Sequence, residues 1–230
     1  YYPLLMGLAL LPVLRLRRGW MVLAAWFLAC AVFALANLHL LAWSASSNDS
    51  IAKLYPDGVL GRKALASLLQ GSPDMVTGNG PWDAIALLLC LVALIWGAAT
   101  AWGQSVQASS IDAEPLDQQA TPNQQVGAAM LALAGSSTFL MAAAISGFGY
   151  VYKASLLLLC VPLLALTIRS HSSKPCSADA ATMLILIALA VTIGTEPLLL
   201  TIATMTVASY AFGLGAVTIL RSIRAPERAT

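Results

Sequence analysis

The feature that most constrains this chain is the apolar run Ala181–Leu220, which is about 40 residues long. As one α-helix it would measure roughly 60 Å, twice the thickness of about 30 Å of the hydrocarbon core of a bilayer. Glycine often ends a helix and proline is favoured in the first turn of the next one. The sequence Gly194-Thr195-Glu196-Pro197 therefore predicts a turn that divides the run into two antiparallel helices.

Other apolar runs precede this one, and most of them exceed the 18 residues that are typical of a membrane-spanning helix. They are Pro3–Leu14, Gly19–Trp43, Trp82–Trp102, Val126–Gly147 and Val151–Ile168. The first would form a helix of only about 18 Å and is expected to be a truncated span or a re-entrant piece. The prediction is an all-α fold, a polytopic transmembrane helical bundle of about seven membrane segments.

The composition excludes a water-soluble domain of ordinary kind. Of the 230 residues, 59% are hydrophobic and 10% are charged, whereas soluble domains carry about 25% charged residues. The net charge of +2 comes without a basic stripe, so nucleic acid is not an expected partner. The expected partners are the lipid bilayer and other membrane subunits. The chain starts at Tyr1, which indicates a removed leader or a piece of a longer product.

The basic residues predict an orientation, because lysine and arginine are enriched in cytoplasmic loops. If every second loop is cytoplasmic or matrix-like, that side holds Arg15, Arg17, Arg18, Arg169, Lys174, Arg221, Arg224 and Arg228. The other side holds Lys53, Arg62, Lys63 and Lys153. The C-terminus is therefore expected on the cytoplasmic side. Residues 103–125, which this assignment places in an inner loop, contain no lysine or arginine. They are the weak point of the assignment.

The predicted organisation alternates membrane segments with loops. Residues 1–43 form two membrane segments joined by a basic turn, 44–81 an outer loop, 82–102 the third membrane segment, 103–125 a polar inner loop, 126–220 four membrane segments, and 221–230 a basic inner tail. The outer loop contains the glycosylation sequence Asn48-Asp49-Ser50, whose use stays open.

The outer loop also contains the pattern of a short amphipathic helix. Asp57 is expected to cap it and Gly71 to end it. Its apolar face is expected to consist of Val59, Leu60, Ala64, Leu68 and Leu69. A helix of about a dozen residues is too short to span, so it should lie along the membrane surface or cover the bundle.

Ionisable residues near the outer ends of the segments are the candidates for chemistry. Lys153 lies between Tyr150 and Tyr152, which favours an interfacial lysine whose ammonium reaches the headgroups. The alternative is an outer vestibule containing Lys153, Glu196, Asp83 and His39, because ionisable residues within a membrane are functional by default. His39 and His171 are expected on opposite sides, so we predict no metal site.

A stripe of small and weakly polar residues predicts a packing seam on the last helix. It comprises Thr201, Thr204, Ala208, Ala211, Gly215 and Thr218. In lipid, small residues let helix backbones approach closely, and this drives association. Hydroxyls such as those of Ser136, Ser137 and Thr138 are further candidates to line a pathway, although helix packing is their commoner use.

No catalytic or nucleotide-binding motif assigns a reaction or a cofactor. The chain contains no P-loop, no dinucleotide glycine fingerprint, no HExxH and no complete GxSxG elbow. The leading hypothesis is a transport or translocation component, or a subunit of a larger membrane complex. The alternatives are a membrane-embedded enzyme with an outer-leaflet acid or base, and a structural membrane subunit without chemistry.

Overall fold

The fold of the described residues is all-α, apart from one pair of two-residue strands. The structure, a computed structural model, describes residues 19–36, 59–70, 81–108, 122–141, 143, 149–170, 175–192 and 197–224. Its helices are α2 (Gly19–Ala36), α4 (Arg62–Gln70), α5 (Pro81–Ala108), α6 (Pro122–Leu140), η5 (Val151–Cys160), α7 (Val161–Ser170), α8 (Pro175–Thr192) and α9 (Pro197–Arg224). The strands are β1 (Val59–Leu60) and β2 (Gly149–Tyr150).

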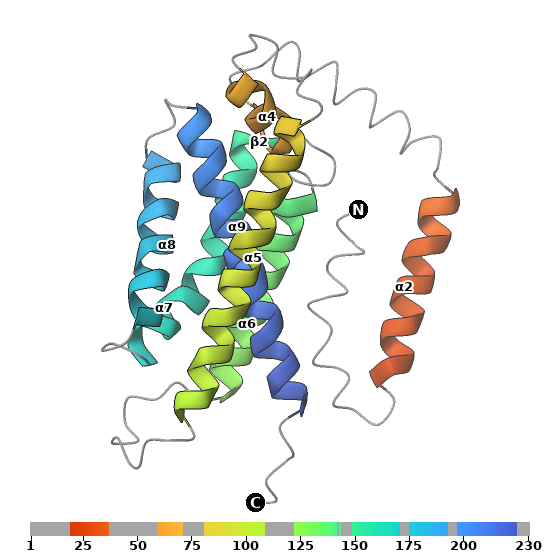
Figure 1. Ribbon diagram of the computed structural model, residues 1–230. Helices are drawn as coiled ribbons and strands as arrows, with labels where there is room; N and C mark the ends of the chain where they lie inside the picture. The colour runs from red at the N-terminus through yellow and green to blue at the C-terminus, as the bar shows by residue number, and fades with distance from the viewer. Residues whose placement is uncertain are drawn as a thin grey trace, which may run out of the picture.

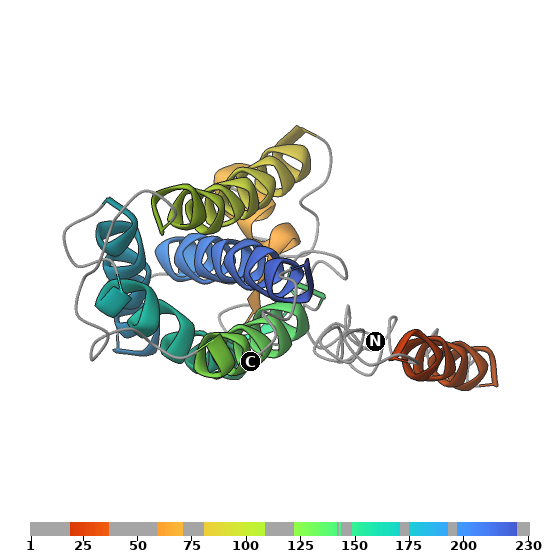
Figure 2. The same cartoon turned by 90° about the horizontal axis from the view of Figure 1, so that it is seen from below.

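Successive long helices of the bundle run in alternating directions (Figure 1). From the end where α4 lies, α5 runs away, α6 returns, η5 and α7 run away, α8 returns and α9 runs away again. The chain order of these helices therefore matches an up-and-down bundle. The helix α2 stands apart from the others (Figures 1 and 2), and none of its described side chains is buried.

Helix α9 is the centre of the bundle. Seen along the helices, it lies between α5 on one side and α6, α7 and α8 on the others (Figure 2). Its largest buried side chains are Tyr210, Leu214, Ile219 and Val207, each fully enclosed. In the most apolar stretch of α9, 67% of the residues are buried, whereas in that of α5 only 28% are buried.

The backbones of α5 and α9 touch through two glycines. A Cβ atom on Gly97 of α5 would lie 2.8 Å from the carbonyl carbon of Tyr210 and 3.0 Å from its Cα. A Cβ atom on Gly213 of α9 would lie 3.0 Å from the backbone nitrogen of Ala98 and would collide with the carbonyl group of Leu94. Each helix thus needs a glycine at the point where the two helices are in contact. Small residues of this kind let helix backbones approach closely.

The predicted seam on α9 faces the interior of the bundle. Thr201, Thr204, Ala208 and Ala211 are fully enclosed, Gly215 is buried and Thr218 is half-buried. At Gly215 a Cβ atom would lie 3.2 Å from the carbonyl oxygen of Ala129 and from Cγ of Leu133. This face of α9 therefore packs on α6, whereas Gly213 packs on α5.

Helix α5 exposes most of its apolar surface to the outside of the bundle. Its exposed large apolar side chains are Trp82, Ile85, Leu87, Leu88, Leu89, Leu91, Val92, Ile95, Trp96 and Trp102. Water-soluble monomers rarely expose apolar patches beyond a few hundred Å². Both α5 and α9 contain a stretch long and apolar enough to cross a membrane, Pro81–Gly103 and Leu198–Arg224 respectively.

Several elements differ from the sequence-based expectation. Val59 and Leu60, expected on the apolar face of the outer-loop helix, form a strand instead. The run Val151–Ile168, expected as one helix, is a 3₁₀ helix followed by an α-helix that starts at Val161, beside Pro162. Proline accounts for the junction, because it cannot donate the hydrogen bond that would continue the preceding helix.

The helix ends also depart from the predicted boundaries. Helix α5 continues to Ala108 and α6 begins at Pro122, so helix occupies both ends of the expected polar loop 103–125. The first apolar segment and the sequence Asn48-Asp49-Ser50 lie outside the described residues.

The glycine contact between α5 and α9 predicts a strong difference between two substitutions on one helix. Gly97→Ala should destabilise the bundle by about 1–3 kcal/mol, because the added methyl group meets the backbone of Tyr210. Gly103→Ala is the matched control, since a Cβ atom there meets nothing within 4 Å. Thermal unfolding in detergent measures both variants, and equal midpoints for the two would contradict the contact.

Candidate functional site

The end of the bundle that carries α4 is formed in part by the strand pair and by the residue that starts this helix. Strand β1 pairs with β2 in antiparallel register, Val59 with Tyr150 and Leu60 with Gly149. Gly61 follows with φ of 134°, a conformation that favours glycine. Its carbonyl oxygen accepts a hydrogen bond from the backbone N–H of Leu65, at 2.8 Å. The helix therefore begins at Arg62, with Gly61 in the capping position for which the sequence had suggested Asp57.

Helix α4 covers the starts of α5 and α9 rather than standing free. Ala64, Leu65, Ala66 and Ser67 are all buried, and four consecutive buried residues cover every side of a helical turn. Leu65 contributes to the same apolar core as Ala86 of α5. The short helix is thus part of the packed interior, as a cover on one end of the bundle.

An ion pair joins α4 to α5. The guanidinium of Arg62 contacts the carboxylate of Asp83, and the two side chains are only 16% and 20% exposed. Asp83 lies in the first turn of α5, where a negative charge is also favoured by the helix dipole. Its second oxygen, Oδ1, is buried and has no hydrogen-bond partner among the described residues. Asp83 therefore holds α4 in place through one oxygen.

Of the four residues of the predicted outer vestibule, the structure describes the side chain of Asp83 alone. Asp83 is engaged by Arg62. Lys153 is the third residue of η5, which starts at the end where α4 lies, but its side chain lies outside the described residues. Glu196 and His39 also lie outside them. The grouping of these four residues stays a prediction.

A small hollow lies beneath α4, between α5 and α9. Leu65, Ala86, Leu89, Cys90, Ile202, Met205 and Thr206 line it. It has room for about one water molecule, whereas sites for small organic ligands usually measure about 300–1,000 Å³. The hollow is therefore too small to bind an organic substrate.

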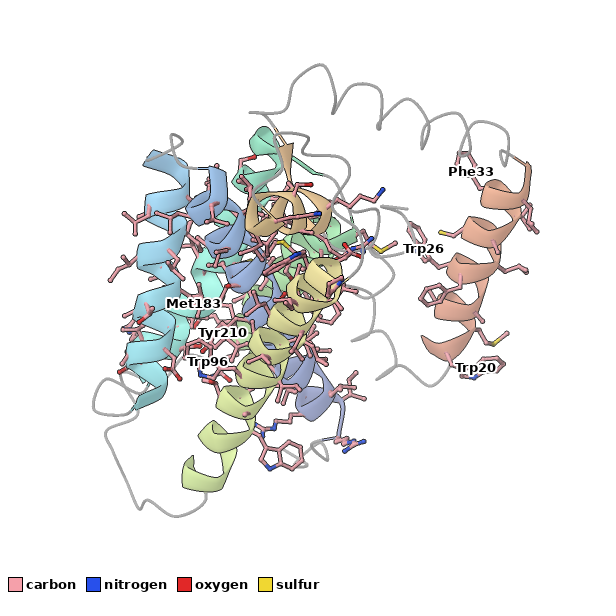
Figure 3. The ribbon with its side chains drawn as sticks, turned by 45° about the horizontal axis from the view of Figure 1, so that its top comes forward. Trp20, Trp26, Phe33, Trp96, Met183 and Tyr210 are labelled. Carbon is pink, nitrogen blue, oxygen red and sulfur yellow. The ribbon has the colours of Figure 1, made fainter. Side chains whose placement is uncertain are left out.

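A second polar contact, which the sequence analysis missed, joins α5 to α8. The indole N–H of Trp96 donates a hydrogen bond of 3.1 Å to Oδ2 of Asp179. The ring of Trp96 also meets Tyr210 edge to face, with centroids 5.3 Å apart. Figure 3 shows Trp96, Tyr210 and Met183 close together where α5, α8 and α9 meet. The arrangement ties three helices together through one aromatic ring and one carboxylate.

The sequence analysis begins the apolar run at Ala181 and therefore leaves Asp179 outside the predicted helix. The structure starts α8 at Pro175, so Asp179 is already in the helix. Proline is common at the first helical position, and Lys174-Pro175 was the signal that would have placed this boundary correctly.

Several hydroxyl groups within the bundle donate to carbonyl oxygens of their own helix. Thr100 donates to Trp96 at 3.0 Å, Thr167 to Leu163 at 2.9 Å, Thr204 to Leu200 at 2.7 Å and Thr218 to Leu214 at 2.8 Å. Ser136 donates in the same way to Ala132. A hydroxyl that donates to the preceding turn has used its only donor hydrogen. This pattern supports packing rather than a polar pathway in the described part of the bundle.

Within the ranges that the structure describes, no three His, Cys, Asp or Glu side chains come together as metal ligands. Comparison of the chain with protein-family models, with curated proteins and with solved structures gives no match. The chemistry of the site therefore has to be argued from its own contacts.

The Arg62–Asp83 pair predicts a measurable coupling between α4 and α5. Arg62→Met and Asp83→Asn should each increase amide hydrogen exchange in α4, because each leaves a half-buried polar partner unpaired. The double variant should recover part of the loss, with a coupling free energy of about 0.5–3 kcal/mol. Strictly additive effects would mean that the pair does not hold α4. Gln70→Ala, at the exposed end of α4, serves as the control.

Proposed function

We propose that this chain is a polytopic integral membrane protein that acts as a subunit of a larger membrane assembly. The observation that carries the membrane location is helix α5, because only 28% of the residues are buried in the most apolar part of its stretch Pro81–Gly103. The core helix of a soluble protein would be mostly covered. A helix of this apolar length with its surface outward is stabilised by lipid, because water would make that exposure costly.

The lengths of the other helices fit the same slab. Helices α6 and α8 have 19 and 18 residues, or about 27–29 Å at the α-helical rise, close to the hydrocarbon thickness of about 30 Å. Helix η5 is about 20 Å long at the 3₁₀ rise, and α7, which follows it directly, is about 15 Å long at the α-helical rise. These lengths support the bundle of several spans that the sequence predicts.

The role as a subunit rests on α2. Trp20, Leu28 and Leu35 are between 63% and 67% exposed, and Figure 3 shows α2 apart from the other described helices, with Trp20 and Trp26 on its surface. Packing against a second protein would give the exposed apolar side chains of α2 neighbours beyond those that the described part of the chain supplies. A neighbouring subunit is thus the partner that we propose.

Transport or translocation is proposed for the assembly rather than for this bundle alone. A pathway needs polar groups that face a cavity, whereas the hydroxyls of Thr100, Thr204 and Thr218 donate within their own helices and the hollow beneath α4 admits about one water molecule. An enzyme at the outer leaflet is the second hypothesis. The engagement of Asp83 by Arg62 weighs against Asp83 as its acid or base.

For orientation, we propose that the C-terminal end of α9 faces the cytoplasmic or matrix-like side. Arg221 and Arg224 lie in its last turn and Arg169 in the last turn of α7. Arg62 and Lys63 belong to α4 at the opposite end. The excess of basic residues at the first end, together with those in the loops, supports this choice.

Cysteine labelling at two positions tests the proposed spanning bundle and its orientation. Cysteines introduced as Gln70→Cys and Arg224→Cys, both at exposed positions, should react with a membrane-impermeant maleimide from opposite sides of sealed vesicles. Wild-type protein with its native cysteines gives the background. Labelling of both from one side, or release of the protein from membranes at alkaline pH, would contradict the spanning bundle.

The subunit role is tested by photo-crosslinking in native membranes. A photoreactive residue in place of Leu35 on α2, 67% exposed, should crosslink to a second protein, whereas one in place of Leu133 on α6, 1% exposed, should crosslink within the chain. A chain that crosslinks only to lipid from position 35, and that migrates as a monomer in mild detergent, would contradict the role.

A further inference from the structure

Arg221 is fixed where the ends of α5 and α9 meet. Its Nη1 donates to the carbonyl oxygen of Ala101 on α5. Its guanidinium carbon lies 5.0 Å from the centre of the Trp102 ring, within the distance of a cation–π contact. The side chain therefore bridges the two helices and holds its charge against an aromatic face.

The second terminal nitrogen of Arg221 lacks an acceptor. Nη2 is buried, yet it has no hydrogen-bond partner among the described residues. A guanidinium carries five N–H donors, and a buried donor without an acceptor is unfavourable, more so when it is charged. Arg224, one turn later on α9, is exposed and lies on the same side of the helix because residues three apart are neighbours. The two guanidinium groups together favour an anion.

We propose that Trp102, Arg221 and Arg224 bind the phosphate of an anionic phospholipid headgroup. This inference rests on the proposed membrane location. The apolar stretches of α5 and α9 end at Gly103 and Arg224, so these three residues lie at headgroup depth. Trp102 is 60% exposed, and tryptophan is enriched at this depth. A guanidinium matches the oxygens of a phosphate with two parallel hydrogen bonds.

A lipid fits the surroundings of Arg221 better than a free phosphate ion. Leu220, next to Arg221, is 47% exposed, and the outward face of α5 continues from Trp102 to Ile95 as exposed apolar side chains. Acyl chains can cover this surface while the phosphate meets the guanidinium groups. Basic residues beside a membrane span attract anionic lipids, at about fivefold in affinity for each charge.

The test is native mass spectrometry of the protein in detergent with equal amounts of phosphatidylglycerol and phosphatidylcholine. Wild-type protein should retain phosphatidylglycerol in preference. Arg221→Gln should lower that preference about fivefold or more, and Arg221→Lys, which keeps the charge without the fork, should lower it less. Arg169→Gln is the matched control, because Arg169 is an exposed arginine in the last turn of α7. It should lower the preference less than Arg221→Gln does, because it removes one charge at the same end of the bundle and leaves Arg221, Arg224 and Trp102 in place.

Three results would overturn the inference. They are equal retention of both lipids by the wild-type protein, an unchanged preference in Arg221→Gln, and removal of the preference by millimolar inorganic phosphate, which would identify a site for free anions. If Arg221→Gln does not fold, Arg221→Lys and the wild-type preference decide the matter. Release from membranes at alkaline pH would be a failure of the proposed function. Equal lipid retention by protein that stays in the membrane would refute the lipid site alone.

Discussion

The close approach of the α5 and α9 backbones at Gly97 and Gly213 is the contact on which the rest of the bundle depends. In the membrane location that we propose, the hydrophobic effect does not hold helices together, because the surrounding acyl chains are as apolar as the side chains. Association then depends on backbones that approach closely enough for dispersion and weak polar contacts. Once α5 lies against α9, Leu65 of α4, Ala86 of α5 and Leu200 of α9 share one apolar core.

The same packing determines where polar chemistry is found. Within the described bundle, hydroxyls such as those of Thr204 and Thr218 donate to the preceding turn of their own helix, and the ion pair Arg62–Asp83 lies at one end. Arg221 lies at the other end against Trp102. In the membrane location that we propose, polar groups have to find partners within the protein, and these contacts supply partners for some of them. It leaves the two ends, and the surfaces of α2 and α5, as the places where the protein can meet other molecules.

The sequence alone predicted the helical character of the fold, because long apolar runs admit few alternatives. It also indicated a small-residue face on α9, since a spacing of three and four residues is visible in one helix. The partner of Gly97 was not visible in the same way, because it depends on which helices become neighbours. The pairing of Val59 with Tyr150 and of Arg62 with Asp83 likewise joins residues far apart in the chain. Asp179 was lost through a boundary error of a few residues, and Lys153, Glu196 and His39 keep the status of predictions.

The central claim is that lipid, and not water, surrounds α5. The most direct measurement places a nitroxide at Leu88, which is 57% exposed on α5, and another at Gln70 on the exposed end of α4. In vesicles, collisions with dissolved oxygen and with a water-soluble nickel chelate are then compared by electron paramagnetic resonance. The account predicts that the label at position 88 meets oxygen and is protected from the chelate, while the label at position 70 meets the chelate. Equal access of the chelate to both positions would contradict it.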